Sequence, residues 1–324
     1  MRVMTFSQKI PYRRYAAIAI AGAATLIVLL FVFAEGVALI GTDIIRAPNW
    51  KRLDTHQMFL QHQLNKLRSG PHILVFGTSR NNMLSPEYLS RPVINVNYVY
   101  GTPRAILKCL RTLDEQQIRN VEKVYMLVDY HTLEKGRYQR DIDHSFIGYL
   151  RETAANFTLH RARVAINTIG INLGMPYPYY LSSDGYVVPA AADAHTAFGV
   201  PQRPDRNFRF DAVDELRELQ RFLAETGIQA VYYTSTLPTK ILQAWGEELV
   251  VRYMRVLADT VGSHYQLIYV PEISGDERNF SDESHLNGIG YRKLYVETDW
   301  NKYLTTPANV EDRIVQLKAA LRKN

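Results

Sequence analysis

The stretch "HILVFGTSRN", residues 72–81, decides the fold, because it contains an apolar run typical of a buried strand and this run is followed at once by small and polar residues. Residues 73–76 are apolar and of strand length, and residues 77–80, Gly-Thr-Ser-Arg, follow directly. A short apolar run of this kind is typical of a parallel strand that is covered on both faces. Ser79 is therefore either a turn residue that stops the strand or a nucleophile held at its carboxyl end.

Similar apolar runs recur along the chain and alternate with helical patterns. The further strand candidates are "VINVNYVY" (93–100), "KVYMLVDY" (123–130), "QAVYYTS" (229–235) and "YQLIYV" (265–270). The helical patterns cover residues 102–118, 210–227, 240–262, 288–302 and 309–322. This alternation predicts a three-layer α/β/α fold, a doubly wound parallel sheet with right-handed crossovers. Residues 131–208, rich in Tyr, His, Arg and Pro, interrupt it and indicate an insertion between the third and fourth strands, a lid or substrate-facing element.

Composition narrows the class of protein. The 324 residues are 47% apolar and 22% charged, which is ordinary for a folded chain. A net charge of +6 favours an anionic membrane surface or polymer, and because no nucleic-acid motif is present we expect no nucleic-acid partner. A single cysteine, Cys109, excludes an internal disulfide framework and a cysteine-rich zinc site. We expect no metal and no cofactor.

The N-terminal region predicts a location. Residues 15–34 carry no charge, and about 20 apolar residues are needed to cross a bilayer. Basic residues precede this run, which predicts a cytoplasmic N-terminus and an exported remainder. The expected segments are a cytoplasmic basic tail (1–14), a single transmembrane anchor in the cytoplasmic membrane (15–40), a linker with an amphipathic helix (41–70) and an extracytoplasmic, periplasmic domain (71–324).

A serine needs a base to act as a nucleophile, and the segment "NFSDESHLNG", residues 279–288, supplies a candidate. Asp282 precedes His285 by three residues, so its carboxylate can fold back on the imidazole and fix its tautomer. Ligands bind at the carboxyl ends of strands in an open parallel sheet, and both segments follow predicted strands. We therefore expect Ser79 Oγ to lie about 3 Å from an imidazole nitrogen of His285.

These motifs resemble the SGNH hydrolase superfamily, also called GDSL-like. Residues 77–79 match its Gly-Asp-Ser-like block, with Thr78 in place of the usual aspartate, and Asp282 and His285 match its late Asp-x-x-His block. The resemblance covers about residues 71–130 and 228–295. It implies a catalytic serine, histidine and aspartate at these positions.

This sequence departs from the family's usual pattern at the residues of the oxyanion hole. Gly101 matches the family's glycine after the second strand, but Asp129 ends the third strand where an asparagine is usual. The hole must then use backbone N–H groups, for which Arg80 and Gly101 are the candidates, or another side chain. Asp129, His131 and Asn81 are candidates for substrate contacts, with a loop cap as the alternative for Asp129.

A membrane-tethered serine site also resembles one branch of the superfamily. That branch includes the D-alanyl transfer protein of teichoic acid synthesis and the acetyl-transfer proteins of alginate and cellulose modification. The resemblance implies a serine O-acyltransferase that works beside a membrane-bound O-acyltransferase and acylates hydroxyls of an envelope glycan or polyol polymer. Two alternatives stay open: an anchored esterase that removes such groups, and a non-catalytic SGNH-like scaffold subunit.

Overall fold

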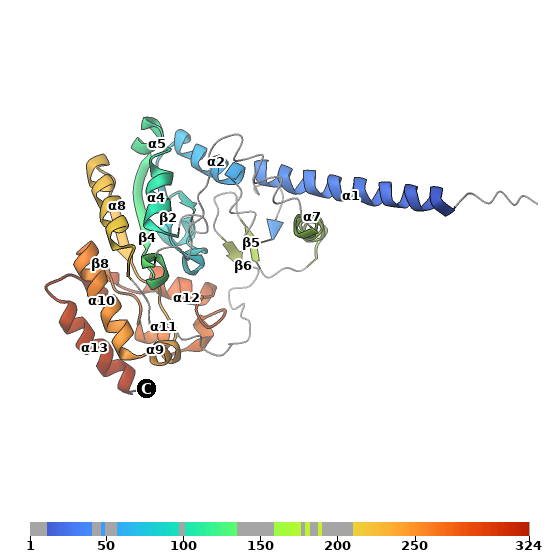
Figure 1. Ribbon diagram of the computed structural model, residues 1–324. Helices are drawn as coiled ribbons and strands as arrows, with labels where there is room; N and C mark the ends of the chain where they lie inside the picture. The colour runs from blue at the N-terminus through green and yellow to red at the C-terminus, as the bar shows by residue number, and fades with distance from the viewer. Residues whose placement is uncertain are drawn as a thin grey trace, which may run out of the picture.

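The computed structural model describes residues 12–40, 47–48, 57–96, 101–134, 159–175, 179–181, 187–189 and 210–323. Its centre is a six-stranded sheet in the order β3-β2-β4-β7-β8-β9 (Figure 1). The strands are β2 (His72–Phe76), β3 (Val93–Asn95), β4 (Val121–Leu127), β7 (Ala230–Tyr233), β8 (His264–Tyr265) and β9 (Leu304–Thr305).

The sheet is parallel from β3 to β8, and only the edge strand β9 is antiparallel. The chain passes from β2 outward to β3 and then returns to the other side of β2 for β4. Strand order therefore reverses at β2, and in open α/β sheets ligands bind outside the carboxyl ends of the strands at such a point. Ser79 follows β2 and Asp129 follows β4, so both lie at this reversal.

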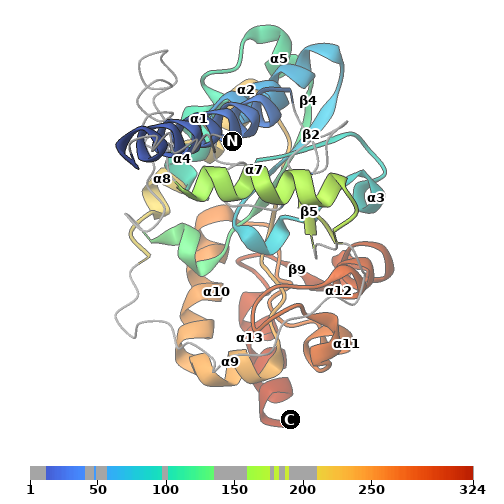
Figure 2. The ribbon, with the colours of Figure 1, turned by 90° about the vertical axis from the view of Figure 1, so that its right-hand side faces the viewer.

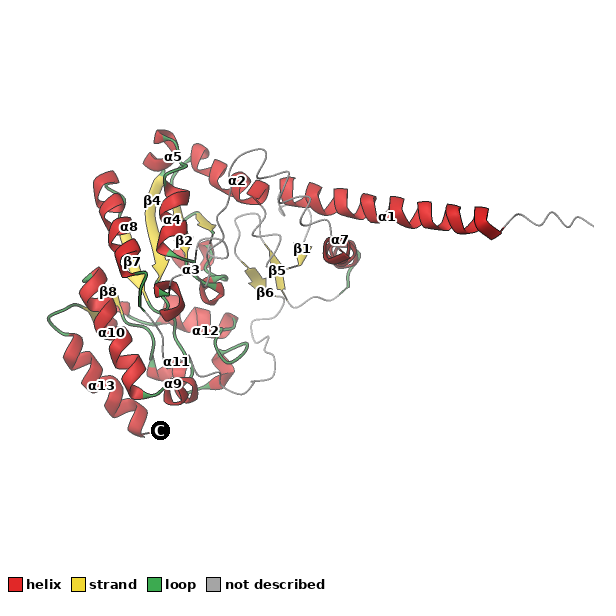
Figure 3. Ribbon diagram, in the orientation of Figure 1, coloured by secondary structure: helices red, strands yellow, loops and turns green. Residues whose placement is uncertain are grey.

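Helices cover both faces of the sheet (Figure 3). Leu74 and Phe76 of β2 belong to one core, while Ile73 and Val75 belong to the other, because successive strand side chains point to opposite faces. The first core packs on α2 (Gln57–Asn65), α4 (Pro103–Leu110), α8 (Val213–Thr226), α10 (Glu247–Val261) and α13 (Val310–Lys323). The second packs on α3 (Pro86–Leu89), α11 (Pro271–Ser274) and α12 (Gly288–Arg292), which Figure 2 shows on the other side from α10. The α/β class is confirmed, and the arrangement is compatible with the predicted three layers.

Two predicted helices are broken in the structure. The pattern at 102–118 forms α4 and α5 (Glu115–Arg119), because Asp114 starts α5 with a reciprocal capping box to Gln117. The pattern at 240–262 forms α9 (Thr239–Trp245) and α10, separated by Gly246 at φ +87°. The left-handed backbone there ends one helix before the next begins.

The C-terminal part differs from the prediction more strongly. The expected strand 265–270 is reduced to the short β8, and β9 joins the sheet from a segment that was predicted to lie between two helices. The expected helix 288–302 consists of α12, a π-helical turn (Lys293–Glu297) and the 3-10 helix η6 (Trp300–Tyr303). The helix expected at 309–322 forms as α13.

The predicted anchor at 15–40 falls within a helix, α1 (Tyr12–Ile40), which extends away from the sheet (Figure 1). A membrane span needs about 20 consecutive apolar residues. Among the described residues, no helix combines the length and the apolar character that a membrane span requires, so the predicted anchor is not found there.

The linker and the insertion meet in a small antiparallel sheet. Strand β1 (Ala47–Pro48) pairs with β5 (Tyr179–Leu181), which pairs with β6 (Val187–Pro189). Helix α7 (Leu159–Asn172) of the insertion contacts α1. Strand β1 of the predicted linker and strands β5 and β6 of the insertion 131–208 therefore associate with each other, while residues 49–56 and 135–158 are among those outside the described residues.

Candidate active site

The turn that carries Ser79 depends on Gly77. This glycine has φ +147°, and a Cβ there would lie 2.6 Å from Cβ of Leu127 at the end of β4. Thr78 follows in extended conformation, and the 3-10 helix η2 (Ser79–Asn81) begins directly after it. The close approach of two parallel strand ends thus requires glycine and places Ser79 at the carboxyl edge of the sheet.

Ser79, His285 and Asp282 form one hydrogen-bonded chain. Ser79 Oγ lies 2.7 Å from His285 Nε2, and His285 Nδ1 lies 2.8 Å from each carboxylate oxygen of Asp282. An ionised carboxylate only accepts hydrogen bonds, so Nδ1 carries the proton and Nε2 can accept from the serine hydroxyl. The distances agree with the predicted convergence of the three side chains, while their catalytic role stays a prediction.

Asp282 also organises the turn that holds the histidine. Its Oδ1 accepts from the backbone N–H groups of Ser284, at 2.8 Å, and His285, at 2.9 Å. Burial acts to raise the pKa of Asp282, but the hydrogen bond and charge of His285 and these two N–H groups outweigh it and lower the pKa to about 2. Asp282 is therefore ionised at neutral pH. Its side chain and that of His285 are each 30% exposed, so a substrate can reach them.

The segment around His285 is clamped to the 3-10 helix η4 (Glu277–Asn279). Asn287 caps α12 by accepting from Gly290 N–H at 3.0 Å, and its amide donates to the carbonyl of Arg278 at 2.8 Å. A Cβ on Gly290 would lie only 2.1 Å from the carbonyl oxygen of Asn279. Close backbone packing therefore fixes the turn that presents the histidine.

The buried side chain of Asn81 stabilises the turn that carries Ser79. It is fully buried, and its Nδ2 donates to the Phe76 carbonyl at 3.0 Å and to the Tyr233 hydroxyl at 3.1 Å. Tyr291 Oη donates to the carbonyl of Arg80 at 2.7 Å in the same region. The predicted substrate contact of Asn81 is therefore not supported, since its side chain is enclosed by the framework of the turn.

Asp129 and the Arg80 side chain are likewise directed into the protein. Asp129 is 2% exposed, and its Oδ2 accepts from Arg80 Nη1 at 2.7 Å and from Thr78 Oγ1 at 3.0 Å. Its Oδ1 accepts from Ser235 Oγ at 2.6 Å. A buried charge is stable only when it is paired and hydrogen-bonded, and this carboxylate meets that condition. The structure thus argues against Asp129 as a substrate contact, and it leaves the backbone N–H of Arg80, rather than its side chain, as a candidate for the oxyanion hole.

The structure gives less information on Gly101 and His131, the two other predicted site residues. Gly101 is buried next to Thr102, whose hydroxyl caps α4 by accepting from Ala105 N–H at 3.3 Å. His131 belongs to the 3-10 helix η3 (Tyr130–Leu133), but its side chain lies outside the described residues. The proposed roles of Gly101 and His131 stay predictions.

Ser235, which donates a hydrogen bond to Asp129, lies close to the candidate site and was not predicted from the sequence. It follows β7 in the run "YYTST", where an apolar strand turns polar at its carboxyl end, as after β2. The same signal that singled out Ser79 could have singled it out.

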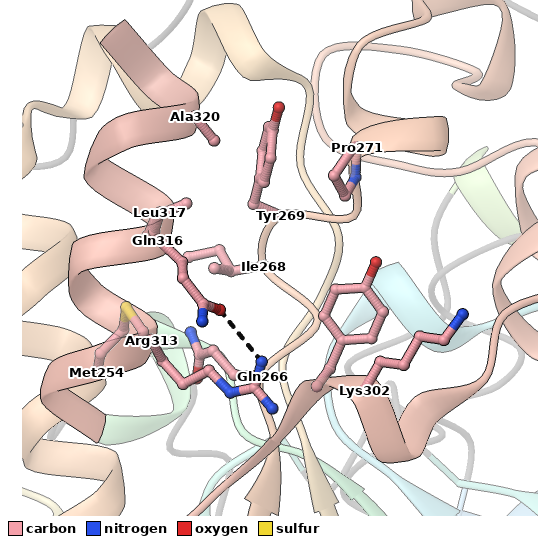
Figure 4. Close-up of a pocket in the computed structure, with 11 residues that line it drawn as sticks. Met254, Gln266, Ile268, Tyr269, Pro271, Lys302, Arg313, Gln316, Leu317 and Ala320 are labelled. Carbon is pink, nitrogen blue, oxygen red and sulfur yellow. Dashed lines mark hydrogen bonds between the residues drawn. The ribbon is translucent and has the colours of Figure 1, made fainter. Parts of the chain in front are cut away.

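A cavity of about 270 Å³ lies between helix α13 and the segment that follows β8 (Figure 4). Its lining includes Gln266, Tyr303 and Arg313, and Arg313 Nη1 donates to Gln316 Oε1 at 3.2 Å within it. Strand β8 is three strands from β2, about 14 Å at about 4.8 Å per step, so this cavity is separate from the Ser79 site. Among the described residues, no group of three His, Cys, Asp or Glu side chains could hold a metal ion.

No protein-family model and no curated protein matches the chain. One fold can serve many functions, so the geometry and chemistry of the site itself carry the functional information.

Proposed function

We propose that the chain is a serine enzyme of the SGNH type that forms an acyl-serine at Ser79. The observation that carries the proposal is the chain of contacts from Ser79 Oγ to His285 Nε2, at 2.7 Å, and from His285 Nδ1 to Asp282, at 2.8 Å. It lies at the carboxyl edge of the sheet beside the strand-order reversal, where ligands bind in open α/β sheets.

The chemistry follows the general scheme for an activated serine. The Ser79 hydroxyl proton moves to His285 Nε2 as Oγ bonds to the acyl carbonyl carbon, and the carbonyl electron pair moves onto its oxygen. Collapse of this tetrahedral intermediate expels the leaving group, which takes the proton from His285. The ionised Asp282 stabilises the imidazolium in between. A second hydroxyl, from a sugar, a polyol or water, then repeats these steps and releases the acyl group.

The oxyanion hole in this proposal consists of backbone donors. Arg80 N–H contacts Thr78 Oγ1 only at 3.4 Å, near the limit of a hydrogen bond, so a developing oxyanion can replace this weak acceptor. Gly101 N–H is the second candidate. One missing donor costs about a hundredfold to a thousandfold in rate, which leaves considerable catalysis intact.

The acceptor that we propose is a hydroxyl of an envelope glycan or polyol polymer, and the acyl donor a membrane-bound O-acyltransferase. Support comes from the sequence resemblance to membrane-tethered acyl-transfer proteins and from the net charge of +6, which suits an anionic surface. In this proposal the domain that carries Ser79 lies outside the cytoplasm, at the outer face of the membrane.

Two other functions compete with transfer. An esterase would use the same residues, with water as the acceptor. A non-catalytic scaffold is favoured by one observation, the carboxylate of Asp129 at the position where the resembled family carries an oxyanion-hole asparagine.

A serine-reactive fluorophosphonate probe separates enzyme from scaffold. The wild type should be labelled covalently at Ser79, and Ser79→Ala should not be labelled. Ser263→Ala, which removes an exposed serine ahead of β8, is the matched control and should be labelled like the wild type. The acyl content of envelope glycan from cells that express each variant at equal levels then distinguishes transfer, which adds acyl groups, from esterase action, which removes them. Normal labelling of Ser79→Ala would reject covalent serine catalysis.

A further inference from the structure

The buried carboxylate of Asp129 connects three strand ends. It follows β4, and it receives hydrogen bonds from Thr78 and Arg80, which follow β2, and from Ser235, which follows β7. Thr78 and Arg80 are the two residues on either side of Ser79. One carboxylate thus holds both chain neighbours of the candidate nucleophile.

The pair of Arg80 and Asp129 is costly to bury, which points to a geometric role. Their side chains are 10% and 4% exposed, and two charges removed from water need excellent geometry to recover their desolvation. Burial acts to lower the pKa of Arg80, but Asp129 and Tyr130 outweigh it, so the guanidinium stays charged. It also lies over the Tyr130 ring at 5.6 Å from the centroid. Because the guanidinium of Arg80 is charged, buried and bound to Asp129, the backbone next to Ser79 has little freedom to move.

The Arg80 residue is also held through its main chain. Tyr291 Oη donates to the Arg80 carbonyl at 2.7 Å, and Asn82 N–H donates to the Ser79 carbonyl at 3.4 Å. Side chain and backbone of Arg80 are therefore fixed by different elements, the end of β4 and helix α12.

We propose that Asp129 is a positioning residue for Ser79: by holding Thr78 and Arg80 it sets the distance of Ser79 Oγ from the reacting carbon and of the Arg80 N–H from the carbonyl oxygen. This inference rests on the proposed function. It also assigns Asp129 a role different from that of the asparagine in the resembled family, since a carboxylate accepts hydrogen bonds and cannot donate one to an oxyanion.

The two roles predict opposite effects of Asp129→Asn. If the position belonged to the oxyanion hole, an asparagine there would add a donor and raise reactivity. If Asp129 instead positions Ser79, the variant loses reactivity at Ser79. The amide has only one acceptor oxygen, and its NH₂ group then faces the donors of Thr78, Arg80 or Ser235. A misplacement of about 1 Å costs about a hundredfold in rate, so we expect a loss of about tenfold to a hundredfold.

The experiment measures fluorophosphonate labelling of Ser79 in the full chain as a function of probe concentration and pH. For Asp129→Asn we expect the limiting rate constant to fall about tenfold to a hundredfold, with the half-saturating probe concentration and the pH midpoint unchanged. A merely structural effect would instead lower the amount of protein that is labelled at completion, at an unchanged rate constant. Glu311→Gln, which breaks an exposed arginine–carboxylate pair with Arg255, is the matched control and should label like the wild type.

Thr78→Val keeps the buried ion pair and serves if Asp129→Asn does not fold. It removes one 3.0 Å donor to Asp129 and one weak 3.4 Å contact to the Arg80 N–H, and it should lower the limiting rate constant at least about threefold. Wild-type or faster labelling of Asp129→Asn, or of Thr78→Val where Asp129→Asn is unfolded, overturns the positioning role while the proposed function stands. Absence of labelling in the wild type overturns the proposed function and this inference with it.

Discussion

Asp282→Asn gives a stability change whose size and pH dependence follow from the structure. The carboxylate accepts from the imidazole of His285 and from two backbone N–H groups, which lowers its pKa from 3.8 to about 2. This lowering of the pKa corresponds to about 2.5 kcal/mol of stabilisation when the group is ionised. Because both side chains are 30% exposed, solvent screening reduces this to about 1 to 2 kcal/mol.

The sign of the pH dependence is determined by the direction of the shift. A lowered pKa in the folded state means that the contribution of Asp282 is complete above its unfolded pKa of about 3.8 and is lost as the pH falls toward about 2. About half of it should be lost at pH 3. The asparagine variant has no such titration, so the difference in unfolding free energy between wild type and variant should shrink as the pH falls from about 5 to 3.

The measurement is denaturant unfolding of both proteins at pH 7, 5, 4 and 3. Other carboxylates titrate in the same range, but they are common to both proteins and cancel in the difference. Asp259→Asn, an exposed aspartate on α10, is the control and should change the unfolding free energy by less than about 0.5 kcal/mol at pH 7. No destabilisation of Asp282→Asn at pH 7, or a difference that stays constant down to pH 3, would refute the structural reasoning.

The remaining predictions concern the nucleophile, the histidine turn and the location of the chain. Ser79→Ala should change the unfolding free energy by no more than about 0.5 kcal/mol, yet abolish probe labelling and acyl modification. His285→Ala should abolish both as well, and the double variant should be no worse than either single one, because residues that act as a unit are strongly non-additive; additive losses in acyl modification would contradict a shared step. Gly290→Ala should lower the unfolding free energy by about 1 to 3 kcal/mol, since its Cβ would lie 2.1 Å from the Asn279 carbonyl oxygen, and an unchanged denaturation midpoint would contradict that packing. A phosphatase fused after residue 60, active only when exported, should be active; an inactive phosphatase with an active cytoplasmic reporter at the same position would place the domain inside the cell.

Local sequence patterns were sufficient for strands β2, β3, β4 and β7 and for the main candidate site residues. The run at 72–76 is apolar at every position from Ile73 and becomes a strand buried on both faces, because strand formation there needs only uninterrupted apolar side chains. Ser79, Asp282 and His285 could be found since the polar ending of a strand and the Asp-x-x-His spacing are both local signals. The spacing brings carboxylate and imidazole together within one turn, whatever the rest of the chain does.

Helix boundaries were less predictable because they depend on single residues within a periodic pattern. The helical period continues through Gly246 and Asp114, and only the left-handed backbone of the first and the capping box of the second end one helix and start another. Strand β9 could not be predicted, since its pairing to β8 depends on where the C-terminal segment passes the sheet edge.

The sequence by itself determined the α/β class, the strand that carries Ser79 and the histidine turn, because these depend on contacts between residues close in the chain. Only the tertiary structure decided that Asn81, Asp129 and the Arg80 side chain are enclosed in the protein. Their partners come from distant segments, Tyr233 for Asn81 and Ser235 for Asp129. A polar residue after a strand has the same sequence signature whether it faces solvent or its neighbours, and the difference arises from which strand ends the fold brings together.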